Sequence, residues 1–244
     1  MSSATRIALP APAAAIGFRP EFLDFQRGIR VGNLEDNERI TRILKRALEE
    51  RYAQPFVTER WGRGVFWRWI GYLPKANKTC KPLSSKVSFG CSKFFLEVDT
   101  DAALFKCGLQ VERGYVRAPR EARACQLQAD WDWHRLLKGL KPGSAMERQL
   151  KRLLVREGFR LFAGAWSEDS QEFSKSDFPE MRRLRRVLDS AAQNTWAGFQ
   201  LYYAMDQDAV RASTGVDLVE SMLAIFEEVT PVMNLCMESV LHAE

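Results

Sequence analysis

The sequence has few of the residues and spacings that identify a cofactor site. Its 244 residues include no apolar run near the ~20 residues that a membrane-spanning helix needs, so we expect no membrane partner. The five cysteines form no C-x-x-C pair and have no zinc spacing, and their odd number favours reduced thiols in a cytoplasmic protein. Only two histidines are present, and a glycine-rich phosphate loop is missing.

A β-hairpin is the clearest element that the sequence contains. Phe94, Leu96 and Val98 alternate with more polar residues, and a similar run follows the polar turn at residues 99–102: Phe105, Cys107, Leu109 and Val111. One apolar face and one mostly polar face are typical of an antiparallel sheet that is covered on one side. The short side chains of the turn can bond their own backbone.

Amphipathic segments on both sides of the hairpin predict helices. They lie at 33–51, 127–138, 144–158, 179–191 and 216–240, the last interrupted at Pro231, and a short apolar cluster at 18–29 also predicts a helix. Further strands are predicted at 65–72, 159–166 and 196–205. We therefore predict an α+β fold: a central antiparallel β-meander with amphipathic helices packed on one face, and a possible second, smaller strand–helix unit in the C-terminal half.

Domain organisation follows from composition. We predict that residues 1–17 form a disordered leader. Pro10 and Pro12 break an alanine-rich stretch that superficially resembles a signal peptide. Residues 18–244 predict a single α+β domain, with a possible subdivision near 118–143.

Charge is distributed unevenly along the chain. Residues 60–93, here called the basic segment, hold eight basic residues and no acidic one, whereas residues 201–244 hold eight acidic residues and only Arg211 to oppose them. Such asymmetry indicates either an anionic partner for the basic segment or mutual attraction of the two regions within the fold.

Aromatic residues within the basic segment suggest a nucleic-acid interface. If residues 65–72 form a strand, Trp67 and Trp69 share one face, where they could stack on unpaired bases beside basic side chains. The candidate residues for binding nucleic acid or another polyanion are Arg60, Arg63, Trp67, Arg68, Trp69, Lys75, Lys78 and Lys81. The alternative is that the tryptophans are core residues and that the lysines belong to a solvated loop balanced by the acidic region.

Other clusters carry weaker functional signals. Asp99 and Asp101 could hold Mg²⁺ or Mn²⁺, although a role in the turn is the simpler interpretation, and the D-x-D-A pattern recurs at residues 206–209. A D-x-D-x-H run at 130–134 is interpreted as structural. Arginines at 182–186 and basic residues at 148–156 could extend an anion-binding surface or form solvated helix faces.

Three hypotheses about function remain open. The first is a nucleic-acid or polyanion-binding or accessory protein that uses the basic segment. The second is a protein–protein interaction subunit that binds partners through its acidic C-terminal helix. The third is a metal-dependent enzyme that acts on a phosphate-containing substrate. No cofactor other than a divalent metal is suggested, and we favour a protein that is not an enzyme.

Overall fold

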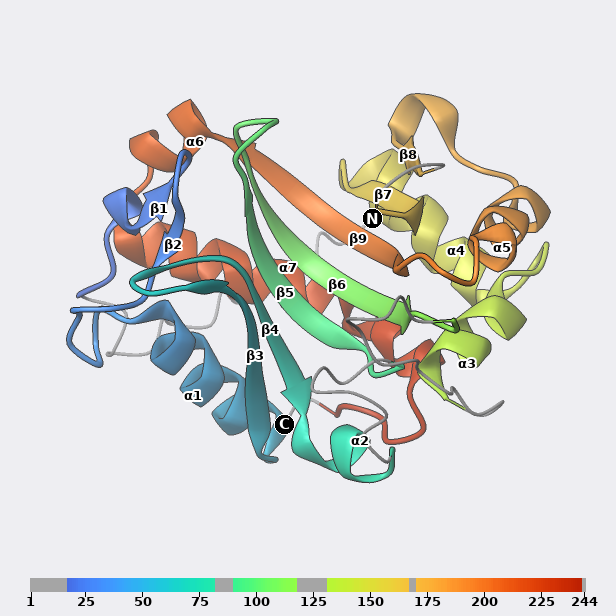
Figure 1. Ribbon diagram of the computed structural model, residues 1–244, viewed down its shortest axis with the longest axis horizontal. Coiled ribbons are helices and arrows are strands. Elements are labelled where there is room, and N and C mark those ends of the chain that lie inside the picture. The colour runs from blue at the N-terminus through green and yellow to red at the C-terminus, as the bar shows by residue number, and fades with distance from the viewer. Residues whose placement is uncertain (1–16, 82–89, 118–130, 167–169, 243–244) are drawn as a thin grey trace, which may run out of the picture.

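A single antiparallel sheet forms the centre of the computed structural model, which describes residues 17–81, 90–117, 131–166 and 170–242 (Figure 1). Within these residues the sheet has nine strands: eight follow the order β1-β2-β4-β5-β6-β9-β7-β8, and the ninth, β3, pairs with β4. The strands are β1 (Leu23–Asp24), β2 (Gly28–Arg30), β3 (Phe56–Arg63), β4 (Phe66–Pro74), β5 (Lys93–Asp99), β6 (Leu104–Gly114), β7 (Arg160–Ala165), β8 (Gln171–Phe173) and β9 (Ala197–Asp206).

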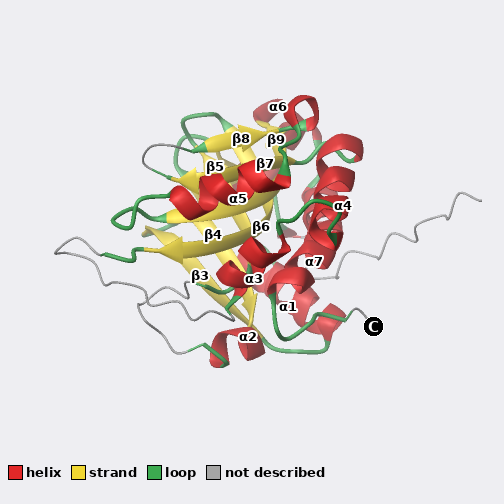
Figure 2. Cartoon of the chain, turned by 90° about the vertical axis from the view of Figure 1, so that its right-hand side faces the viewer, coloured by secondary structure: helices red, strands yellow, loops and turns green. Residues whose placement is uncertain are grey.

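Helices cover one face of this sheet. Figures 1 and 2 show α1 and α7 lying along the same side of the strands, with α4 next to α7. The helices are α1 (Ile40–Tyr52), α2 (Lys75–Thr79), α3 (Asp132–Gly139), α4 (Ala145–Lys151), α5 (Met181–Ser190), α6 (Gln207–Ala212) and α7 (Gly215–Cys236). A π-helical turn, Arg152–Arg156, extends α4, and 3-10 turns occur at Pro20–Phe22 and Lys175–Asp177.

The predicted hairpin is β5 and β6, paired in register from Lys93 opposite Gln110 to Asp99 opposite Leu104. Its alternating apolar residues are all buried in the main core beneath the helices: Phe94, Leu96, Val98, Phe105, Cys107, Leu109 and Val111. The intervening residues of β5 and β6 point to the opposite side, here called the polar face. The predicted fold class, an antiparallel meander with helices on one face, is confirmed.

The C-terminal strands extend the same sheet rather than form a separate unit. β9 pairs with β6 along nearly its whole length, and β7 pairs with the other edge of β9. Gly108 on β6 permits this approach, because a Cβ at that position would lie 2.0 Å from the carbonyl oxygen of Leu201 on β9. The sheet thus contains strands from both sides of residues 118–143, of which 118–130 lie outside the described residues.

Three sequence predictions about local structure are wrong. Residues 18–29 form a 3-10 turn followed by β1 and β2 instead of a helix. No strand was predicted at the position of β3, because the second half of this strand is mostly polar and exposed. α7 continues through Pro231, since the buried side chains of Val229, Val232 and Met233 pack both sides of that position into the core. The predicted leader falls outside the described residues except for Gly17.

Candidate anion-binding site

A pocket of about 840 Å³ lies between α1 and β3, and basic side chains dominate its lining. Three of the predicted binding residues, Arg60, Trp67 and Lys78, line it together with residues that the prediction missed. The basic lining residues are Arg39, Arg42 and Lys45 from the start of α1, Arg60 from β3 and Lys78 from α2. No aspartate or glutamate is among the described residues that line this pocket.

The pocket is elongated along β3. Its lining runs from Val57, the second residue of β3, to Gly64, just beyond the last residue of that strand. At about 3.3 Å per residue, this stretch of strand is roughly 20 Å long. The basic side chains reach the pocket from α1, β3 and α2.

Nearby carboxylates neutralise this charge only in part. Four of the five lining cations have a carboxylate partner, at N–O distances of 3.6–3.8 Å. These distances exceed those of normal charge-assisted hydrogen bonds, so we expect each pair to contribute little to stability. The partners number three, fewer than the five cations: Asp36, Glu49 and Glu59.

Arg60 and Trp67 form the aromatic part of the lining. The guanidinium carbon of Arg60 lies 4.3 Å from the centroid of the Trp67 ring. Arg39 Nε and Trp67 Nε1 are buried donors for which the described residues supply no acceptor.

Trp69 does not join this surface, which contradicts the predicted pair of exposed tryptophans. Trp61 pairs with Trp69 but Gly62 pairs with Trp67, so Arg68 is an extra residue in β4 and forms a β-bulge. The bulge places Trp67 against the main core on the helix side, whereas Trp69 packs with Phe95 on the polar face. Trp69 is only 9% exposed, and its Nε1 donates to Gln110 Oε1 at 2.9 Å.

Lys81 is also unsuited to binding a ligand, contrary to the prediction. It is only 6% exposed, and its Nζ lies 3.0 Å from Asp132 Oδ1. Asp132 Oδ2 in turn accepts from Asn77 Nδ2 at 2.9 Å and from the backbone N–H of Ser92 at 2.6 Å. This buried group joins α2, α3 and the start of β5, so Asp132 of the D-x-D-x-H run has a structural role.

The remaining predicted cations are solvent-exposed. Arg63, Arg68 and Lys75 are exposed, and no ion pair joins them to another residue within the described part of the chain. Arg63 and Arg68 belong to the β3–β4 hairpin, and Lys75 begins α2. Residues 82–89 of the basic segment lie outside the described residues.

Three glutamates of the acidic C-terminal region form ion pairs with arginines of the described residues. These ion pairs run from Glu227 to Arg51 at 2.7 Å, from Glu228 to Arg152, and from Glu238 to Arg135 at 4.0 Å. All three arginines lie outside residues 60–93. The first two contacts join α7 to α1 and to the π-helical turn after α4, and the third joins the segment after α7 to α3.

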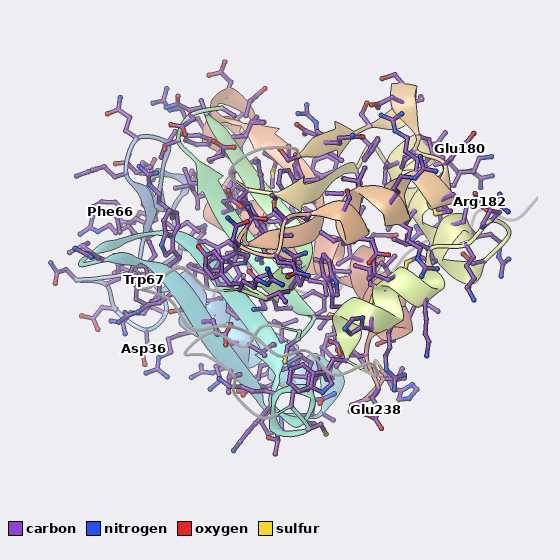
Figure 3. All side chains as sticks on the ribbon, turned by 45° about the vertical axis from the view of Figure 1, so that its right-hand side comes forward. Asp36, Phe66, Trp67, Glu180, Arg182 and Glu238 are labelled. Atoms are coloured by element: carbon purple, nitrogen blue, oxygen red, sulfur yellow. The ribbon has the colours of Figure 1, made fainter. Side chains whose placement is uncertain are left out.

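A second basic surface lies on α5, where Arg182, Arg185 and Arg186 line a pocket of about 430 Å³ together with Asp189. Figure 3 shows Arg182 and Trp67 at opposite ends of the molecule. The two basic surfaces are therefore separate, and the smaller one includes a carboxylate.

A buried lysine on the polar face holds β3 in place. Lys93 on β5 is completely buried, and its Nζ lies 3.0 Å from Glu59 Oε2 on β3 and 3.2 Å from Glu112 Oε2 on β6. Burial alone lowers the pKa of Lys93, but Glu112 and Glu59 raise it above its ordinary value of 10.5. Burial also raises the pKa of Glu112, yet the ammonium beside it favours its charged form, so we treat the pair as ionised.

The polar network continues across the sheet from this lysine. Gln110 Nε2 donates to Glu112, and Gln110 Oε1 accepts from Gln200 Nε2 at 2.7 Å. Gln200 Nε2 also donates to Glu97 Oε2 at 3.1 Å. Burial raises the pKa of Glu97 above its ordinary value of 4.5, although Lys106 and Gln200 oppose this rise.

Asp99 has the contacts of a turn residue. Its Oδ1 accepts from the backbone N–H groups of Asp101 and Ala102, at 3.1 and 2.9 Å, and its Oδ2 lies 2.7 Å from Lys106 Nζ. The second D-x-D-A copy uses the same bond, because Asp206 Oδ1 accepts from the backbone N–H of Ala209 at 2.8 Å. Among the described residues, no group of three or more His, Cys, Asp or Glu side chains is arranged to hold a metal ion.

Comparison with known protein families, with curated proteins and with solved structures finds no significant match to this chain. None of the helices in the described residues has both the length and the apolar character required to cross a bilayer. The function is therefore argued from the geometry of the site alone.

Replacing Lys93 with methionine should destabilise the protein strongly. The substitution leaves two carboxylates near each other without their buried cation, and such a loss typically lowers the free energy of unfolding by about 3–5 kcal/mol. Lys75→Met, at an exposed position, should change it by less than about 0.5 kcal/mol. Urea denaturation followed by circular dichroism measures both, and similar small changes would contradict the structural role of Lys93.

The two aspartates of the turn should differ in their effect on stability. Asp99→Ala removes two hydrogen bonds to backbone N–H groups and the Lys106 pair, so unfolding should become easier by about 1–2 kcal/mol. Asp101→Ala should change stability by less than about 0.5 kcal/mol. A melting temperature that rises with Mg²⁺ and loses this rise in either variant would instead support the metal site.

Glu97→Gln should alter the pH dependence of stability. A raised pKa means that folded protein holds the proton more tightly than unfolded protein, so the ionisation of Glu97 lowers stability as pH rises from its unfolded value of 4.5. Glutamine cannot ionise and avoids this loss. The melting temperature of the variant minus that of the parent should therefore be more positive at neutral pH than at pH 4 or below, and the opposite trend would refute the assignment.

Proposed function

We propose that this protein binds nucleic acid or another polyanion in the pocket between α1 and β3, as a binding or accessory protein. The observation that carries this proposal is the convergence of five basic side chains from three separate elements on one pocket whose described lining has no carboxylate. Cations placed side by side repel one another, and an anionic ligand relieves that repulsion.

The length of the pocket favours a linear polyanion over a small anion. A single phosphate is small compared with a pocket of about 840 Å³, so it could contact only some of the basic side chains. A chain of phosphates can contact several in succession, and each contact releases counterions into solution. Affinity should therefore depend steeply on salt concentration.

The alternative hypotheses receive less support. Glu227 and Glu228 of the acidic helix already pair with Arg51 and Arg152, which leaves less charge for a protein partner. Asp99 accepts a hydrogen bond within its own turn and pairs with Lys106, which weakens the hypothesis of a metal-dependent enzyme. The free thiols of Cys80, Cys91, Cys107 and Cys236 support a reducing compartment such as the cytoplasm as the site of action.

Removing two cations of the pocket should weaken polyanion binding and flatten its salt dependence. Arg42→Ala combined with Arg60→Ala removes two contacts, which should lower the slope of log affinity against log salt by about 0.7 per contact for a single strand. Fluorescence anisotropy with labelled oligothymidylate, and competition by heparin and polyphosphate, measures the slope. Lys151→Ala on α4 removes one exposed charge outside the pocket and should leave the slope unchanged.

Three outcomes would contradict the proposal. One is the lack of salt-sensitive binding to oligothymidylate, heparin and polyphosphate alike. Another is an equal loss in Lys151→Ala, which would indicate an effect of net charge alone. The third is a larger loss in Arg186→Ala, which would move the binding site to α5. Thermal melting of each variant checks that the fold is retained.

A further inference from the structure

Trp61 is the most exposed large hydrophobic side chain in the described part of the chain. It is 64% exposed, whereas the next such residues, Val116 and Val240, are 41% exposed. It lies near the end of β3. Figure 1 shows the hairpin that β3 forms with β4. An indole this exposed leaves its flat aromatic ring open to solvent, where an unpaired base could stack on it.

The strand partner of Trp61 is a residue of a buried aromatic cluster. Trp61 pairs directly with Trp69 across β3 and β4, so the two side chains lie on the same face of the sheet. Trp69 is held by Gln110 and packs with Phe95 and Tyr202. The backbone that carries Trp61 therefore has a well-defined position, and its ring extends from the edge of a rigid surface.

The surroundings of Trp61 are basic. Arg60 precedes it and lines the pocket, while Arg63 and Arg68 are exposed in the same hairpin. Because side chains alternate along a strand, Arg60 faces the pocket and Trp61 faces the polar side. A polymer that follows the pocket along β3 reaches Trp61 by passing over the free edge of the strand.

We propose that the polyanion is a single-stranded nucleic acid and that Trp61 stacks on one of its unpaired bases; this inference rests on the polyanion-binding function above. Heparin, polyphosphate and acidic peptides offer charge but no nucleobase for the indole. A duplex keeps its bases stacked inside and offers mainly its groove edges and phosphates. Stacking between a base and an aromatic side chain is tolerant of sequence, so we expect little base preference.

The geometry of the hairpin disfavours an acidic peptide as the occupant. A peptide would add to the free edge of β3 as an extra strand, and this requires a regular row of backbone groups. The β-bulge opposite Trp61 and the positive φ of Gly62, +147°, distort the edge at this point. A nucleic acid does not need a regular strand edge.

The test compares Trp61 with the pocket for ligands that have or lack bases. Trp61→Ala should weaken binding of oligothymidylate on the order of tenfold, and it should leave the salt slope unchanged because no phosphate contact is lost. Heparin binding should not change. Trp61→Phe should retain most of the affinity for oligothymidylate. Arg42→Ala should weaken the binding of both oligothymidylate and heparin. Anisotropy titrations of all variants with both probes give these values.

The outcomes separate the two proposals. If Trp61→Ala leaves oligothymidylate binding unchanged while Arg42→Ala weakens it, the stacking inference is wrong and polyanion binding stands. If Trp61→Ala weakens heparin as much as oligothymidylate, or if polyglutamate or a duplex binds with the same dependence on Trp61, the ligand is not specifically a single strand. If no probe binds in a salt-sensitive manner, the proposed function itself fails.

Discussion

The ammonium group of Lys93 is buried between Glu59 and Glu112, and it holds the face of β3 that carries Glu59 against the sheet. A charge removed from water is tolerated only when carboxylates of good geometry surround it, so β3 must supply Glu59 on the polar face. Alternation along the strand then turns Arg60 toward the pocket and Trp61 back to the polar side. One buried ion pair thus orients both the phosphate-binding and the base-stacking groups that we propose.

Local patterns predicted the parts of the fold that depend on neighbours in sequence. The alternation in Phe94–Val98 and Phe105–Val111 identified the hairpin, because its strands are adjacent and its turn is short. The faces of Trp67 and Trp69 were predicted wrongly, because the bulge at Arg68 exists only in relation to β3. Nothing in the sequence around Lys93 indicates burial, since its partner Glu59 lies 34 residues away.

The candidate site was predicted only in part, because it too depends on contacts between residues far apart in the sequence. Composition drew attention to the basic segment, and Arg60, Trp67 and Lys78 were found in this way. Arg39, Arg42 and Lys45 were missed, although their spacing of three residues places them near one face of a helix. Only the packing of α1 beside β3 brings them to the pocket. Tertiary contacts also exclude Lys81 and Trp69 from the site, because Lys81 pairs with Asp132 and Trp69 donates to Gln110.

Some charged residues of this chain form ion pairs between packed elements, and others are exposed to solvent. Acidic residues of α7 pair with arginines of neighbouring elements, while four cations of the pocket have carboxylate partners at 3.6–3.8 Å. Phosphate contacts at such cations supply affinity that falls with salt, whereas an indole contact depends on the presence of a base. Because these two groups lie on opposite faces of one strand, substitution can remove either without moving the other. Substitutions can therefore test the proposed affinity for charge and the proposed preference for a single strand separately.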